Sequence, residues 1–530
     1  MATVVVLCSG GGDYQQQRRR PSANYEPSSW DYDSICSSPT TQTQQQQQAH
    51  HDHHLLINRV RRLLLDDATT SSSRRLRLIH ELQSVGVAYH FREEIRDILA
   101  SIHHHGLSGD LDLHSAALLF RLLRGHGIPA STDMLLLRPF FFSSTNLHAL
   151  YEASYLAFPG ETVLDEARAL AVQSLPAAYV QQQLPLHWTA PRLQAMWSLT
   201  KQQQAGDYET QIVRELARTD FNLVQSLHRR ELAEVTRWWK HTGLQLQGEF
   251  ARDRVVECFF CAACIAPEPE LVDCREVLAK AGALIVHLDD IYDVYGTPEE
   301  VQAFTDAIAA WDCASSVELP EYMKVMYKAI WETSTTAADR VLRKQGYNVL
   351  PLYKKAWHEL CKAFLTEARW HRQGYMPSLG EYLANGWVTS TGPLLLLHAL
   401  PAAGAATGAP PRLVELASTI FRLCNDGASH QAESARGDAP SSIACCMAEA
   451  WCAGEGQARA TVQGLIADTW KALNKEASSV AAQSMPVAMA ADLCLNLARI
   501  IHCIYQDGDG ITSPTHRMKH MVKDLLFNPI

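Results

Sequence analysis

The sequence has no long uninterrupted apolar run and no excess of positive charge, and each absence excludes a class of protein. No apolar stretch reaches the roughly 18 residues that a membrane-spanning helix needs. The net charge of the 530-residue chain is −10 at pH 7, so the basic surface of a nucleic-acid-binding protein is not expected. The sequence therefore predicts a chain that enters no membrane and binds no nucleic acid.

The sequence also lacks a disulfide framework, although it contains 14 cysteines. Their irregular spacing in so long a chain favours reduced side chains in a reducing compartment. Cys258, Cys261 and Cys264 form a C-x-x-C-x-x-C pattern, but no second ligand pair follows at zinc spacing. Core packing is therefore the favoured interpretation of these three cysteines.

Helical periodicity is what the sequence does contain, whereas alternating strand patterns of any length are absent. From Leu55 onward, apolar residues recur at intervals of three and four, as in LINRVRRLLLDD and PRLVELASTIFRLCND. Glycine and proline fall between these segments. We therefore predict an all-α fold with an N-terminal segment (residues 1–54), an N-terminal helical domain (55–212) and a C-terminal domain (213–530).

A low-complexity tract occupies residues 36–54, CSSPTTQTQQQQQAHHDHH. Such a polar tract buries too little surface to offset the entropy of ordering, so a mobile loop is expected. Its histidines, at positions 50, 51, 53 and 54, would then lack the fixed geometry of a native metal site.

Two clusters of oxygen-bearing side chains have the spacing of metal ligands. In LDDIYD, Asp289 and Asp293 are four residues apart on one helix face, and Asp290 points about 100° away. A lone cluster of this kind is also typical of a solvated helix end. The second cluster repeats the spacing of four with an amide, a hydroxyl and a carboxylate: Asn425, Ser429 and Glu433. All are ligands for Mg²⁺ or Mn²⁺, and Mg²⁺ usually binds a few carboxylates together with phosphate oxygens.

Arginines accompany both clusters. Arg252 and Arg254, in ARDRVVE, precede the first cluster, and Arg422 stands three residues before Asn425. Arginine makes planar, multi-donor contacts with phosphate. Each arginine alone is more readily explained as a surface residue, but together with the acids they predict a clamp for a diphosphate.

These motifs, in this order, resemble those of plant class I terpene synthases over nearly the whole chain. DDIYD is similar to the aspartate-rich motif, NDGASHQAE to the second metal motif and RDR to the arginine motif of that family. RPSANYEPSSW resembles the N-terminal signature, here Arg20 and Trp30, with Pro21 where the angiosperm monoterpene branch usually has a second arginine. DFNLVQSLHRRELAEVTRWWK, ARGDAPSSIACCM and IYQDGDG resemble that monoterpene branch, and the DxDD motif of class II cyclases is absent.

The resemblance implies a C-terminal α-bundle with an active-site cavity and a vestigial N-terminal α-barrel domain, in a monomer. It implies that three Mg²⁺ ions, replaceable by Mn²⁺, bind the diphosphate of a prenyl substrate. The implied metal ligands are Asp289, Asp293, Asn425, Ser429 and Glu433, and the implied substrate contacts include Arg252, Arg254 and Arg422. Ionisation of the carbon–oxygen bond then leaves an allylic cation between apolar walls. Aromatic candidates for its stabilisation, each with plain core packing as the alternative, are Trp331, Trp387 and Tyr505.

Three positions carry further expectations. Replacing Asp290 is expected to be less harmful than replacing Asp289 or Asp293, because its side chain points elsewhere. Cys261 stands where the family commonly has a tryptophan of the pocket wall, so it is expected to influence the product. Asn385 lies before a helix break expected near Gly392 and Pro393. It either bonds to that break or holds a water that converts the cation to an alcohol such as a terpineol.

The substrate length stays open between two alternatives. The motifs favour geranyl diphosphate and a monoterpene synthase of the plastid stroma. The N-terminus, short and poor in arginine for a transit peptide, favours the cytoplasm and a sesquiterpene synthase that uses farnesyl diphosphate. A chain-elongating prenyltransferase would carry a second aspartate-rich motif in place of Asn–Ser–Glu. A catalytically silent prenyl-diphosphate-binding protein is the alternative from another class.

Overall fold

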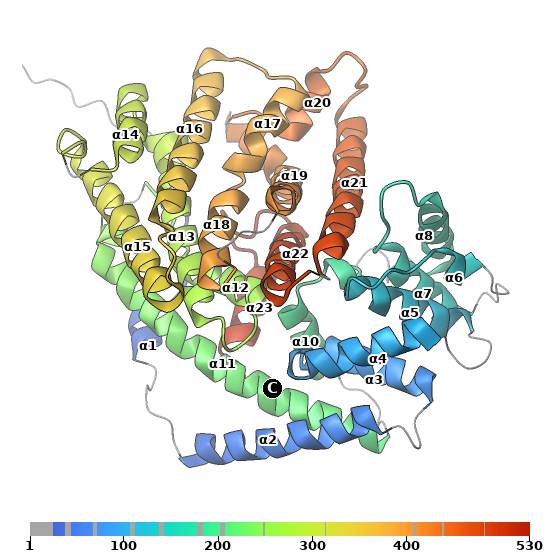
Figure 1. Ribbon diagram of the computed structural model, residues 1–530. Helices are drawn as coiled ribbons and strands as arrows, with labels where there is room; N and C mark the ends of the chain where they lie inside the picture. Colours follow the sequence, from blue (N-terminus) through green and yellow to red (C-terminus); the bar gives the residue numbers. More distant parts are fainter. Residues whose placement is uncertain are drawn as a thin grey trace, which may run out of the picture.

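The computed structural model (Figure 1) describes residues 25–37, 44–66, 71–105, 112–136, 143–176, 184–201, 207–246, 250–312, 314–405, 410–436, 439–481 and 483–530. Helices joined by turns and irregular segments make up these ranges, and no β-strand occurs within them. The prediction of an all-α fold is confirmed. Arg20, half of the N-terminal signature, lies outside the described residues.

The N-terminal part, coloured blue to teal in Figure 1, contains helices of up to 22 residues. They are α1 (Tyr32–Cys36), α2 (Gln44–Leu65), α3 (Ser72–Ser84), η1 (Ala88–Phe91), α4 (Arg92–His105), α5 (Leu113–Gly125), α6 (Asp133–Leu136), α7 (Ser144–Ser154), α8 (Thr162–Ser174), η2 (Leu186–Trp188) and α10 (Pro191–Thr200).

The C-terminal part, coloured green to red, contains helices of up to 35 residues. They are α11 (Tyr208–Thr242), η3 (Leu244–Leu246), α12 (Val255–Ile265), α13 (Val272–Asp290), η4 (Ile291–Tyr295), α14 (Pro298–Ala310), α15 (Glu321–Gln345), α16 (Leu350–Gln373), α17 (Leu379–Thr389), α18 (Gly392–Ala402), α19 (Pro411–Arg436), α20 (Ser442–Ala448), α21 (Glu455–Ala481), α22 (Met485–Tyr505) and α23 (His516–Leu526).

The 35-residue helix α11 connects the two parts. Its N-cap is Asp207, whose carboxylate accepts a hydrogen bond from the backbone N–H of Thr210, and it ends at Gly243 in a left-handed conformation. One side of α11 packs against α2, and it also contacts α12 and α13. The domain boundary expected near residue 213 falls inside this helix, and the division at that point stays a prediction.

The prediction of a mobile loop at residues 36–54 is wrong from Gln44 onward, because α2 begins there. The apolar residues Leu56, Val60 and Leu64 are buried against the core, and they fix the C-terminal half of α2 on α11. Glutamine and alanine are good helix formers, so the preceding tract continues the helix at little cost.

Two neighbouring helices, α17 and α18, meet at the break that the sequence predicted. Thr391 has a left-handed φ of 75°, and Pro393 occupies the first turn of α18. A side chain at Gly392 would meet the Ser418 hydroxyl at 2.4 Å, so glycine allows α18 to approach α19 closely. The predicted break near Gly392 and Pro393 is confirmed.

One helix of the described ranges, α22, is long and apolar enough to cross a membrane by length and composition alone. Within the fold it packs against α12, α19 and α21, and 61% of its most apolar window is buried. A core helix of a folded domain passes the same test.

Candidate functional site

The first acid cluster lies where α13 passes into the π-helical turn η4. The apolar residues Leu284, Ile285 and Leu288 anchor the end of α13 in the core. Beyond them the Asp289 side chain is 31% exposed and Asp293 is exposed, whereas Asp290 is fully buried. The buried run therefore carries two carboxylates to an accessible position and turns the third inward.

Asp290 points at Arg252 of the arginine motif. Its Oδ2 atom accepts hydrogen bonds from the backbone N–H of Arg252 at 2.6 Å and from Nε at 3.1 Å. Its Oδ1 atom lies 2.9 Å from Nη2 of the same arginine. Arg252 also donates to Asp289 at 2.5 Å and to the Thr512 hydroxyl at 2.8 Å. Asp290 was expected to be the least sensitive of the three acids because its side chain points away from the other two. The side chain does point away, but it holds Arg252 in place, which the sequence did not reveal.

Arg254 is occupied by backbone carbonyls. It donates to Ile511 at 2.8 Å, to Thr512 at 3.0 Å and to Glu26 at 3.1 Å. These bonds tie the turn after α22 and the N-terminal segment to the start of α12. Here Arg254 organises the rim of the site, and its direct contact with a diphosphate stays a prediction.

The N-terminal segment lies against the arginine motif. The indole N–H of Trp30 donates to Glu257 at 2.8 Å, and the Tyr32 hydroxyl donates to Asp253 at 2.6 Å. The Arg252 guanidinium lies 5.0 Å from the centre of the Tyr25 ring. The predicted signature residue Trp30 therefore anchors a segment that partly covers Arg252.

The second cluster occupies one stripe of α19. Asn425 and Glu433 are half-buried, and Ser429 is buried with its hydroxyl bonded to the Asn425 carbonyl at 2.9 Å. Asp426, on another face, accepts hydrogen bonds from Tyr382 at 3.0 Å and from the Ser442 N–H at 2.9 Å. Its Oδ1 atom also lies 2.9 Å from Nε of Arg422. Asp426 thus holds Arg422 as Asp290 holds Arg252.

The helices of the two clusters share a neighbour, Glu367 of α16, whose pKa is raised by burial and by the charges of both Asp426 and Asp289. Burial, followed by the charges of Asp289 and Glu367, raises the pKa of Asp293 well above its usual value. The Asp293 side chain is nevertheless exposed to solvent. Burial likewise raises the pKa of Glu433 to about 7; Arg422 opposes this shift, and Asp426 and Asp509 reinforce it. Carboxylates with raised pKa values, collected from α13–η4 and α19, are suited to divalent cations.

A third element, α16, contributes an acid that sequence spacing did not identify. Burial raises the pKa of Glu367 to about 7, Arg422 opposes the shift, and Asp426 and Asp289 reinforce it. The Thr389 hydroxyl donates to Glu367 at 2.7 Å. A signal was present, because Glu367 follows Leu360 and Phe364 along the buried stripe of the helix, where an acid is rare.

Asn385 bonds to α16 and not to the helix break. Its amide nitrogen donates to the Ala363 carbonyl at 3.1 Å and to Glu367 at 3.3 Å. The alternative in which Asn385 bonds to the break at Gly392 is therefore wrong. Binding of a water by Asn385 stays a prediction.

The candidate wall residues separate into two groups. Burial raises the pKa of Tyr505, with smaller effects from Asp509, Arg422 and Cys261 and a hydrogen bond to Asn425, so Tyr505 lies beside the second cluster. Cys261 is half-buried, whereas Cys258 and Cys264 are buried. Trp331 lines a separate pocket with Trp238 and Lys280, and none of the predicted metal ligands lines that pocket. Trp387 is half-buried on α17, and its role stays a prediction.

The raised pKa of Glu433 predicts a pH dependence of stability. An acid whose pKa is higher in the folded than in the unfolded chain stabilises the fold at low pH, and this contribution is lost as pH rises from about 4.5 through about 7. The free energy of unfolding of the wild type minus that of Glu433→Gln should therefore fall by about 1–3 kcal/mol between about pH 5 and pH 8. Urea unfolding in metal-free buffer measures it. Glu415→Gln, on an exposed part of α19, is the control; a flat difference for Glu433→Gln would contradict the prediction.

Both parts of the chain match models of known protein families. Residues 240–472 match the model of the terpene synthase family metal binding domain, and residues 29–194 match the terpene synthase N-terminal domain. The chain is 36% identical over 538 residues to alpha-thujene synthase of Litsea cubeba, covering 96% of this chain and 91% of that protein.

Solved structures are similar over the same extent. A limonene synthase with 2-fluorolinalyl diphosphate is 32% identical, with a TM-score of 0.86, and the match covers 96% of this chain and all (100%) of that one. Isoprene synthase of Populus x canescens, in complex with three Mg²⁺ ions and dimethylallyl-S-thiolodiphosphate, is 35% identical, with a TM-score of 0.83. That match covers 95% of this chain and 99% of the isoprene synthase chain.

Proposed function

The chain belongs to the terpene synthase family and has the class I lyase activity of that family; from this premise we propose that it ionises geranyl diphosphate and converts it to monoterpenes. The observation that supports the proposal is the position of Glu367 on α16, which lies close enough to Asp289, Asp293 and Asp426 for their charges to interact and so brings the acids of α13–η4 and α19 together. The two arginines that lie beside these acids, Arg252 and Arg422, are each fixed by a buried aspartate.

The acids fit divalent cations, because they offer hard oxygen ligands and lie beside other acids: Asp293 beside Asp289, and Glu433 beside Asp426. Asp289 and Asp293 would hold metal on one side, and Asn425, Ser429 and Glu433 on the other, with Glu367 between them. The isoprene synthase complex, with its three Mg²⁺ ions, supports the same number here, and Mn²⁺ is the expected substitute. When bound, these cations supply positive charge that stabilises the diphosphate as a leaving group.

The side chains of the protein have separate tasks in this proposal. Arg252 and Arg422 present guanidinium groups to the diphosphate from the start of α12 and from α19. Arg254 keeps the turn at Ile511 and Thr512 beside them. The segment around Tyr25 and Trp30 covers Arg252 and limits the access of water to the cation.

The relatives support a C10 substrate but also include proteins with a shorter one. The thujene synthase and the complex with 2-fluorolinalyl diphosphate favour a C10 substrate, whereas an isoprene synthase, bound to a dimethylallyl analogue, is equally similar. Relatives described as chloroplastic support the plastid as the site of action, with the cytoplasm and farnesyl diphosphate as the alternative. The complete set of oxygen ligands opposes the silent binding protein.

Parallel turnover of dimethylallyl, geranyl and farnesyl diphosphates with Mg²⁺ tests this proposal. We expect kcat/KM for the geranyl substrate to exceed that for the other two by at least about tenfold. Preference for farnesyl diphosphate would identify a sesquiterpene synthase, longer diphosphates would indicate chain elongation, and no turnover of any substrate would support the silent protein.

Cys261→Trp should change the distribution of products more than the rate. The thiol lies near Tyr505 and not among the metal ligands, so the added indole alters the wall that touches the cation. We expect kcat to stay within about threefold of the wild type, because the ionising groups are untouched. Gas chromatography of the volatiles measures the profile, with Cys261→Ala as the control of small volume. An unchanged profile in the tryptophan variant would contradict the assignment.

Oxygenated monoterpenes such as a terpineol are expected among the products if Asn385 holds the attacking water. Asn385→Ile should then shift the products to hydrocarbons. Total turnover should fall only modestly, since Thr389 still donates to Glu367. Product analysis in H₂¹⁸O identifies the source of the oxygen. A wild type that forms hydrocarbons only, or a variant that still forms the alcohol, would exclude this role.

A further inference from the structure

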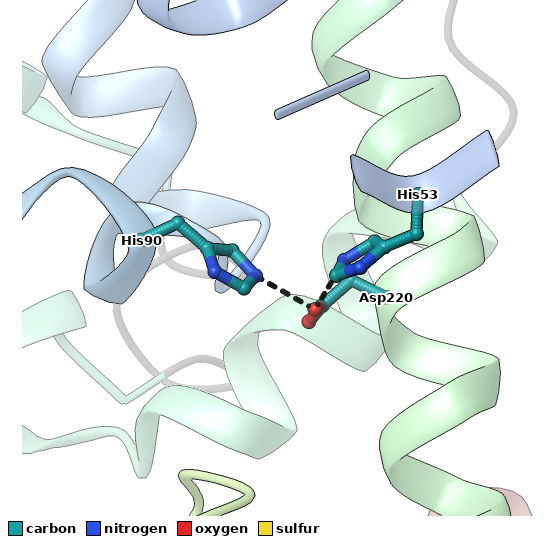
Figure 2. Close-up of side chains that lie close together, drawn as sticks. All are labelled: His53, His90 and Asp220. Atoms are coloured by element: carbon teal, nitrogen blue, oxygen red, sulfur yellow. Dashed lines mark hydrogen bonds and ion pairs between the residues drawn. The ribbon is translucent and has the colours of Figure 1, made fainter. Parts of the chain in front are cut away.

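A cluster of two histidines and an aspartate lies outside the proposed active site, where three elements of the chain meet (Figure 2). His53 is on α2, His90 is in η1 and Asp220 is on α11. Both imidazole Nε2 atoms lie 2.9 Å from the same oxygen of Asp220, Oδ1. In the part of the chain that the structure describes, this is the one group of three His, Cys, Asp or Glu whose ligand atoms all lie within 4.8 Å of one another.

The packing of the surrounding helices fixes this geometry. His53 lies one turn before Leu56, whose burial holds α2 against α11. His90 lies in the short turn between α3 and α4, and the preceding residue, Tyr89, also donates to Asp220 at 2.7 Å. The side chains of His53 and His90 are 14% and 17% exposed, and that of Asp220 is 3% exposed. The ligand atoms are therefore held by three elements and stay close to solvent, which an entering ion requires.

The chemistry of the three groups differs from that of the active-site acids. Two imidazole nitrogens and one carboxylate suit Zn²⁺, Co²⁺ or Ni²⁺, whereas sites built from oxygen alone suit Mg²⁺ or Mn²⁺. The Asp220 oxygen Oδ1 accepts a hydrogen bond from Tyr89 and lies within hydrogen-bond distance of both imidazoles, so it is the atom that would bind the ion. Two arginines lie nearby: Arg192, which interacts with Asp220, and Arg230, which lines the pocket. Their positive charges would weaken the binding of a cation.

A fourth ligand is available one turn away. His50 lines the same pocket of about 370 Å³ as His53, His90 and Asp220. Residues three apart on a helix share a face, so His50 and His53 project to the same side of α2. His51 and His54 are exposed and do not line this pocket.

We propose that His53, His90 and Asp220 bind one divalent transition-metal ion of the zinc type, with His50 or water completing the coordination. The ion would take the place of the hydrogens now shared between the imidazoles and the carboxylate. Each neutral imidazole would then carry its hydrogen on Nδ1 and bind metal through Nε2. The bound ion would join α2 to η1 and α11 and would stabilise the folded chain, because no such site exists once the chain unfolds.

Titration of the chelator-treated full-length protein with Co²⁺ tests the proposal. We expect one equivalent to produce visible d–d absorption without thiolate charge transfer, and one equivalent of Zn²⁺ to abolish it. His53→Ala and His90→Asn should each weaken binding by about tenfold or more. Zn²⁺ should raise the Tm of the wild type and leave that of His53→Ala unchanged.

Two control variants separate this cluster from other metal-binding groups. His51→Ala removes a neighbouring exposed histidine, and Asp289→Ala removes a ligand of the proposed active site; both should retain the absorption. Loss of the absorption in His51→Ala would show that the exposed histidines bind the ion, and loss in Asp289→Ala would place it in the active site. Either result, or the absence of binding in the wild type, would overturn the proposal and leave the cluster as a hydrogen-bonded contact between helices.

Discussion

Asp293→Asn is expected to lower the turnover of geranyl diphosphate by about 10³-fold or more while leaving the fold intact. The substitution keeps the size of the side chain but removes the charge that a divalent cation requires. The pKa of Asp293 is raised by burial and by its acidic neighbours Asp289 and Glu367, so loss of its charge relieves repulsion in the metal-free protein. Thermal unfolding should therefore show an unchanged or higher Tm.

The control for Asp293→Asn is Asp306→Asn, which changes an exposed acid on the adjacent helix α14 in the same way. Steady-state kinetics with saturating Mg²⁺ should give near-wild-type turnover for this control. An Asp293→Asn enzyme that keeps more than about a tenth of the wild-type turnover would contradict the ligand role, since removing one stabilising group of a reacting charge costs at least about 10²-fold.

Asp290→Ala should be the most destabilising of the single substitutions in the aspartate-rich motif. Asp290 is fully buried and makes three contacts of 2.6 to 3.1 Å with Arg252. Its loss leaves a buried guanidinium with only Asp289 as a charged partner, and breaking a buried pair in this way costs about 3–5 kcal/mol. Turnover should fall as well, because Arg252 is no longer held toward the site. Denaturant unfolding and kinetics measure the two effects.

A double variant separates stability from catalysis at this pair. Asp290→Ala combined with Arg252→Met removes both charges, and the folded state should regain much of the lost stability. Turnover should stay low, since the diphosphate has lost an arginine. Equal stability of Asp290→Ala and the wild type, or recovery of turnover in the double variant, would show that the pair has another role.

Local patterns predicted the fold, because helical periodicity, glycine and proline act over a few residues. The break at Gly392 and Pro393 and the apolar end of α13 followed from such patterns. The start of α2 at Gln44 did not, since burial of Leu56, Val60 and Leu64 against a distant helix extends it into the low-complexity tract. Tertiary packing of these apolar residues nucleates the helix, and the helix-forming glutamines then continue it.

The pairs of groups that define the site were harder to predict than its individual members. Spacing identified the two metal-ligand clusters, but it did not show that Asp290 meets Arg252, which is 38 residues away in the sequence. It likewise did not bring Glu367 of α16 into the site, or His53 to His90 and Asp220. Each of these contacts depends on how separate helices pack, and the sequence has no local periodicity that reports it.

The most direct test of the proposed ionisation is to measure the release of inorganic diphosphate from geranyl diphosphate by the wild-type protein. Volatile products are collected in the same vessel. We expect diphosphate and monoterpenes in equal amounts with Mg²⁺, activity with Mn²⁺, and neither product after chelation. Release that continues in the presence of chelator, or metal-bound protein that leaves the substrate intact, would contradict the central claim that these acids and arginines ionise a prenyl diphosphate.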